Sequence, residues 1–160
     1  MKSHKKNLEK IAYEQNTRFQ YLHSERAEVI KKLYNLLVDL DGSLHSALRT
    51  FQAVGELSLV DKVNIIGDNY NSFREYYLPN KIYFDNDLCQ IIEGIIETAK
   101  GVFFDITTYE VDTSGLNERY HGSILRERHE FWEKARKIHE YEISSLKVKL
   151  EEEFRKILGI

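Results

Sequence analysis

The stretch Val29–Ala47, VIKKLYNLLVDLDGSLHSA, contains no proline and places an apolar residue at every third or fourth position. The same spacing extends in both directions, so the sequence predicts one helix from about Lys5 to Ala53. At about 1.5 Å per residue, this helix is roughly 70 Å long, more than the diameter of a compact domain of this size. The period is carried by Leu8, Ile11, Phe19, Leu22, Val29, Leu33, Leu36, Leu40, Leu44, Ala47 and Phe51.

Three further helices are predicted after this one, and they make the fold class all-α. The second covers about residues 58–77 and ends before Pro79, the single proline of the chain, because the residue before a proline disfavours helical geometry. Asp85 is a good N-cap for the third helix, which runs to about residue 109. The polar and glycine-containing break at residues 112–115 separates it from a fourth helix that continues nearly to the C-terminus.

The helix lengths predict an up-down four-helix bundle whose long first and fourth helices extend beyond the two shorter ones. One domain is expected over residues 1–160, with a bundle head at about 30–137. Residues 5–28 and 140–158 are expected to pair as an antiparallel coiled-coil stalk.

Composition excludes several classes of protein. The 160 residues are 42% hydrophobic, which is enough for one core, and the net charge of −3 is spread over a mixed-charge surface with no strong nucleic-acid signal. Cys89 is the only cysteine, so a Cys-rich zinc cluster is excluded and a reducing, cytoplasmic location is expected. The most apolar stretch, residues 88–106, contains four charged residues, so no transmembrane segment is predicted. No cofactor-binding motif is present.

Four residues separate Arg18 from His23 in the stretch RFQYLH. This spacing is similar to the arginine–histidine spacing of the helical ribonucleases of the HEPN superfamily, although the residue after the arginine is commonly polar there and is Phe19 here. The resemblance implies that His23 is an acid/base and that Arg18 stabilises phosphate charge. The alternative is that both are surface residues of the stalk.

Glu118 and His121 form one Glu-x-x-His unit, which places a carboxylate and an imidazole on one helical face. Di-iron helical bundles need two such units and two more glutamates. With 18 glutamates and 6 histidines in the chain, one match is expected by chance. A surface or helix-packing role for His121 is therefore the alternative to a metal site.

Two patches of sequence resemble a group of uncharacterised bacterial proteins built from long helices. They are Tyr21-Leu22-His23-x-x-Arg26-Ala27-Glu28-Val29-Ile30 and Phe73-Arg74-x-Tyr76-Tyr77. The resemblance implies a bacterial cytoplasmic helical bundle, and it supplies neither an activity nor site residues.

These observations favour a non-enzymatic scaffold or adaptor that binds a protein partner or forms a homo-oligomer through the stalk. Apolar stalk residues are expected to be thinly covered, namely Leu8, Ile11, Phe19, Ile143, Leu150 and Phe154. Two alternatives stay open: a helical ribonuclease or toxin-type effector of a bacterial defence system acting through Arg18 and His23, and a metal-binding bundle using Glu118 and His121.

Overall fold

The computed structural model describes residues 2–49, 55–113 and 121–160, and within them the chain is helical with no β-strand, which confirms the all-α class. From His121 to Leu158 the chain forms one continuous helical rod of three successive segments, which we call the C-terminal rod. The helices are α1 (Lys2–Leu48), α2 (Leu59–Asn80), the 3-10 turn η1 (Lys81–Tyr83), α3 (Asn86–Thr113), α4 (His121–Lys137), the π-helical segment η3 (Ile138–Ile143) and α5 (Ser144–Leu158).

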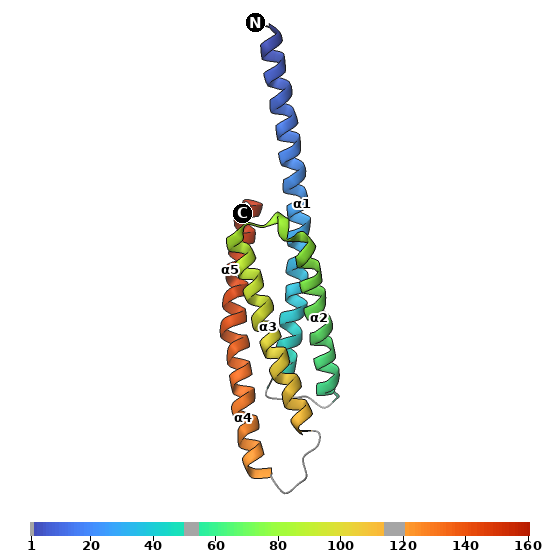
Figure 1. The fold of residues 1–160 in the computed structure, drawn as a ribbon, viewed down its shortest axis with the longest axis vertical. Coiled ribbons are helices and arrows are strands. Elements are labelled where there is room, and N and C mark those ends of the chain that lie inside the picture. Colours follow the sequence, from blue (N-terminus) through green and yellow to red (C-terminus); the bar gives the residue numbers. More distant parts are fainter. Residues whose placement is uncertain (1, 50–54, 114–120) are drawn as a thin grey trace.

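Contacts between α1 and α2 show that these helices are antiparallel. The Lys62 ammonium donates to the carbonyl of Ser46 at 3.2 Å, and the Asn69 amide donates to the carbonyl of Asp39 at 3.1 Å. The later residue of α2 therefore contacts the earlier residue of α1, as expected for two antiparallel helices. Figure 1 shows the two helices side by side over the lower half of α1.

The C-terminal rod is antiparallel to both α1 and α3. The Phe84 ring, just before α3, lies 6.1 Å from the Phe154 ring, and a Cβ added at Gly94 would lie 3.5 Å from Leu146. On the other side, the hydroxyl of Tyr34 on α1 donates to Glu151 at 2.7 Å. These contacts place α5 inside the bundle, and we call this bundle of α1 from Ala27 onward, α2, α3 and the C-terminal rod the head.

The centre of the head is aliphatic and aromatic, and every helix contributes to it. Its fully buried side chains include Leu33, Leu37, Leu40, Leu44, Ile66, Phe73, Tyr77, Leu88, Ile92, Ile95, Ile106, Ile143 and Leu150. The aromatic residues on both sides of Pro79 belong to this core, because the Tyr77 and Phe84 rings stack at 6.5 Å where α2 turns into α3. They close the end of the bundle by packing together.

The predicted helix ends are partly right. Asp85 caps α3 as expected, since its carboxylate accepts from the backbone N–H of Leu88 at 2.9 Å. The end predicted before Pro79 is wrong, because α2 continues through Pro79 to Asn80. A proline in the last turn removes only one helical hydrogen bond just where the helix stops, so its cost is small there.

The predicted two-helix stalk is also wrong, because only α1 extends beyond the head. Residues 5–24 of α1 are all exposed, and Figure 1 shows this part of the helix, in blue, standing alone above the other helices. We call residues 5–24 the projecting segment. The other expected half of the stalk, residues 140–158, packs in the head, where Leu150 is fully buried.

The lengths of α2 and α3 account for part of this difference. α2 has 22 residues and α3 has 28, so at 1.5 Å per residue α3 descends about 9 Å further than α2 rises. The C-terminal rod therefore starts below the end of α1, as Figure 1 shows, and reaches only the level of Ala27 when it ends at Leu158. The prediction assumes that the fourth helix starts level with the end of the first. This register wrongly places residues 140–158 beside the projecting segment.

Candidate interaction site

The projecting segment carries four large apolar side chains in water. Leu8 is 59% exposed, Ile11 51%, Phe19 69% and Leu22 53%. At 3.6 residues per turn, these four positions fall within roughly 100° of arc on one side of the helix. Three of these four residues were predicted from the sequence as interaction residues, and the structure leaves all four uncovered.

This exposed face lies on the same side of α1 as the residues that α1 buries in the core of the head. Stepping by three or four residues from Leu22 leads to Arg26 and Val29 and then to Leu33 and Leu37, which are fully buried. We call the face of the projecting segment that holds Leu8, Ile11, Gln15, Phe19 and Leu22 the apolar stripe. One continuous side of α1 is thus covered by the head at one end and by nothing in the described chain at the other.

Three other residues predicted for the interaction surface are buried, and their assignment to it is wrong. Ile143 is 1% exposed, Leu150 0% and Phe154 4%. They belong to the buried core of the head, so they stabilise the fold. The error follows from the register of the C-terminal rod described above.

Arg18 and His23 are both exposed on the projecting segment, but they do not converge on one point. Five residues correspond to about 500° of rotation, which places the two side chains on opposite sides of the apolar stripe. His23 stacks on Phe19, with ring centroids 6.3 Å apart. At the level of these two residues the helix stands alone and residues 5–24 are all exposed, so no other described part of the chain forms a cleft around them.

The Glu118 and His121 pair lies outside the residues whose side chains the structure describes. Among the described residues, no group of three or more His, Cys, Asp or Glu side chains is placed to hold a metal ion. Over the same residues, no helix combines the length and the apolar character needed to cross a membrane.

A buried polar network ties the C-terminal rod to α1 and was not predicted. His139, only 4% exposed, holds a carboxylate oxygen of Asp41 at 3.0 Å, and Lys147 holds the other oxygen at 2.7 Å. A carboxylate only accepts hydrogen bonds, so Nε2 of His139 carries the donated proton. Both oxygens of the half-buried Asp41 are therefore satisfied by the opposite helix.

The π-helical segment η3 brings His139 to this position. Ala135, His139 and Ile143 are all buried although they are spaced by four residues. In a regular α-helix a step of four residues rotates the side chain by about 400°, which is about 40° more than a full turn. A wider π turn takes up this excess rotation and keeps the three side chains on one face. Ser144 supports the turn by donating to the carbonyl of His139 at 3.5 Å.

The hydrogen bond from His139 is the largest cause that lowers the pKa of Asp41, and the hydrogen bond and charge of Lys147 act in the same direction. Burial opposes them, and the net result is a pKa of about 2, below the ordinary value of 3.8. Burial alone disfavours the charged form of Lys147, but the hydrogen bond and charge of Asp41 raise its pKa overall. The network is a stabilising ion pair between two helices.

We expect this network to make the fold sensitive to acid. Between about pH 4 and pH 2 the unfolded chain binds a proton at Asp41 that the folded chain does not, so stability falls as pH falls through this window. A shift from 3.8 to about 2 corresponds to a loss of about 2 kcal/mol. Urea unfolding at pH 4 and pH 2 should show this loss in the wild type and a smaller one in Asp41→Asn. Equal losses in both proteins would contradict the assignment.

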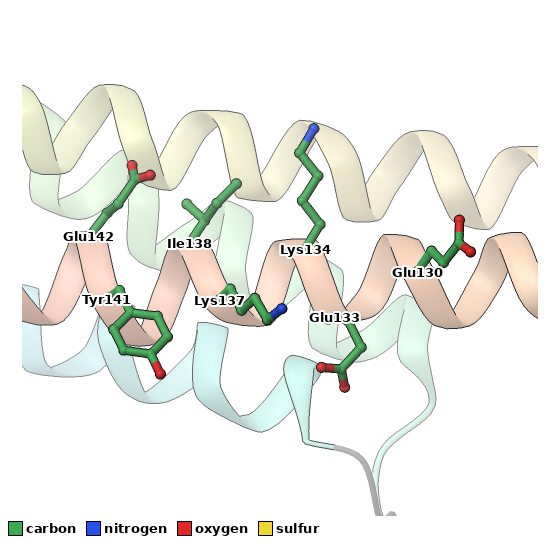
Figure 2. Close-up of a pocket in the computed structure, with 7 residues that line it drawn as sticks. All are labelled: Glu130, Glu133, Lys134, Lys137, Ile138, Tyr141 and Glu142. Atoms are coloured by element: carbon green, nitrogen blue, oxygen red, sulfur yellow. The ribbon is translucent and has the colours of Figure 1, made fainter.

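A trough of about 530 Å³ lies on the outer face of the C-terminal rod, but its residues do not converge on a ligand position. Figure 2 shows the side chains of Lys134 and Glu142 on the side of α3 and those of Glu133 and Tyr141 on the side of α1. All the lining residues come from α4 and η3 alone, and they are Glu130, Glu133, Lys134, Lys137, Ile138, Tyr141 and Glu142. A surface of mixed charge on one rod does not provide the concave, enclosed shape of a ligand site.

A groove of about 310 Å³ lies between α1 and α5 where the projecting segment leaves the head. Ala27, Ile30 and Leu158 line it with apolar surface, and Lys31 and Arg155 add charge. The groove begins at the level where the apolar stripe ends, but Ala27, Lys31 and Tyr34 lie about 100° or more around the helix from the centre of the stripe. The groove and the stripe are therefore separate features of α1.

No protein-family model, curated protein or solved structure matches the chain. No activity is therefore transferred to it from a relative, and the apolar stripe is the candidate site that the geometry itself singles out.

Proposed function

We propose that this protein is a non-enzymatic helical scaffold or adaptor that acts by packing the apolar stripe of its projecting segment against another helix. The observation that carries the proposal is the exposure of Leu8, Ile11, Phe19 and Leu22, each more than half exposed on one side of a helix. An amphipathic helix with anchors spaced by three and four residues is a common mode of helix recognition.

The low stability expected of an isolated helix in water supports this proposal. Its residues, 5–24, make no contact with the head that buries a side chain, and an isolated helix of this length is marginal in water even with favourable residues. Packing the stripe against a second helix removes apolar area from water at about 25 cal/mol per Å² and stabilises the helix at the same time. Association and helix formation therefore favour each other.

Photocrosslinking in the native host tests the proposal. We would place the photoreactive benzoylphenylalanine at Phe19 on the stripe, and at Tyr13 as the matched control, because Tyr13 is 74% exposed on the opposite side of the same helix. The expected result is a defined crosslinked product from position 19 and not from position 13. The same pattern from both positions, or no product from position 19, would contradict the proposal.

A further inference from the structure

We propose that the helix covering the apolar stripe is the projecting segment of a second copy of this chain, packed antiparallel with the two Gln15 residues facing each other. This inference rests on the proposed function, because it names the partner of the same surface. A two-fold symmetric pair requires a self-complementary surface, in which residue i contacts residue j and residue j contacts residue i. The sequence of the stripe meets this requirement.

The stripe is symmetric about Gln15. Leu8 and Leu22 each lie seven residues from Gln15, and Ile11 and Phe19 each lie four residues from it. In the antiparallel pair, Leu8 therefore packs against the second copy's Leu22, and Ile11 against its Phe19. The two Gln15 side chains meet at the axis, where an amide can both donate to and accept from its symmetric counterpart. Every large apolar residue of the stripe gains an apolar partner.

Charges beside the stripe are complementary in the same register. Glu14 and Arg18 lie on the same flank, and in an antiparallel pair of helices each flank meets the equivalent flank of the other copy. Glu14 of each copy then lies opposite Arg18 of the other, which gives two symmetric ion pairs next to Gln15. This arrangement also gives Arg18 a role in association.

The head excludes the parallel alternative. In a parallel pair, both copies would reach Val29 at the same level, but there the stripe is already covered by the head of each copy, and Val29 is 6% exposed. The antiparallel pair places the heads at opposite ends of the paired segments. Each projecting segment is about 30 Å long, so two heads are held apart by roughly that length of paired helix.

The end of α5 fits the same arrangement. α5 is antiparallel to α1 and ends at Leu158, beside Ala27, where the groove between α1 and α5 opens. The second copy's segment is also antiparallel to α1, and its Lys5 comes opposite Glu25. It therefore pairs with the stripe beyond the level where α5 stops, on a different side of α1 from the groove.

Disulfide trapping tests the pairing. We would make Leu8→Cys and Leu22→Cys, give one a mass tag, and oxidise each alone and the two mixed with oxidised glutathione; Cys89 is buried, so the wild type is the background control. The mixture should form the mixed disulfide dimer. Either variant alone should not, because an offset of about 14 residues separates its two cysteines by about 21 Å, beyond the reach of a disulfide.

Charge exchange gives an independent readout. Glu14→Arg alone and Arg18→Glu alone should each dimerise roughly tenfold more weakly in sedimentation equilibrium, because like charges then face each other twice. An equal mixture of the two variants should regain dimerisation, since the arginine introduced at position 14 would face the glutamate introduced at position 18 of the other chain.

Three results would overturn the pairing: a Leu8→Cys disulfide with itself, a failure of the mixed charge variants to associate better than each alone, or a wild type that stays monomeric at all concentrations. A monomeric wild type that still crosslinks from Phe19 to a different protein would overturn the self-pairing and leave the proposed function standing. A monomer with no crosslink from Phe19 would remove both.

Discussion

Phe154→Ala is expected to lower the free energy of unfolding by about 3 to 5 kcal/mol, the range for removing a buried phenylalanine side chain. Phe154 is 4% exposed and its ring lies 6.1 Å from that of Phe84, so its removal leaves a cavity between α5 and the start of α3. Chemical denaturation of the two proteins, followed by circular dichroism, measures the difference.

Phe19→Ala is the matched control, because it makes the same change at a residue that is 69% exposed. At protein concentrations too low for association, we expect it to change the unfolding of the head by no more than about 0.5 kcal/mol. If both variants lose similar stability, then Phe19 and Phe154 have similar surroundings, as they would in a two-helix stalk, and α5 does not pack in the head.

Ile95→Ala is expected to cost about 2 to 5 kcal/mol, because Ile95 is fully buried at the centre of α3 among side chains from the other helices. Ile82→Ala provides the comparison, since Ile82 is 84% exposed in the turn η1 and its side chain has little to lose. Its cost should stay within about 0.5 kcal/mol. Thermal unfolding of both variants checks the prediction, and a cost below about 1 kcal/mol for Ile95→Ala would place α3 outside the core.

The helices were predictable because their signals are local. The apolar period of α1 and the capping carboxylate of Asp85 act within a few residues, and a single proline leaves few places for a break. The register between helices is not local in this sense. It depends on how far each helix extends past its neighbours, and the observed register places residues 140–158 several turns further along α1 than predicted. Ile143, Leu150 and Phe154 were therefore assigned to a stalk that the structure does not contain.

The candidate site was predictable only where its signal is also local. Leu8, Ile11 and Phe19 were identified because the apolar period continues past the expected end of the head. The network of Asp41, His139 and Lys147 was not identified, because residues 98 and 106 positions apart in sequence meet only in the observed register. The one available signal was the repeated spacing of four from Ala135 to His139 to Ile143, which fits a π turn with His139 facing inward.

The distance between residues 9 and 156 within one chain tests most directly whether the apolar stripe is free for another helix. Spin labels at Glu9→Cys and Lys156→Cys, in labelled protein diluted with unlabelled protein to remove distances between copies, would report it by pulsed electron paramagnetic resonance. Since α5 ends beside Ala27, Glu9 lies about 18 residues further along α1, and we predict a separation of about 27 Å or more. A distance near about 10 Å, the spacing of two packed helices, would mean that α5 runs alongside the segment and covers the stripe, which would contradict both proposals.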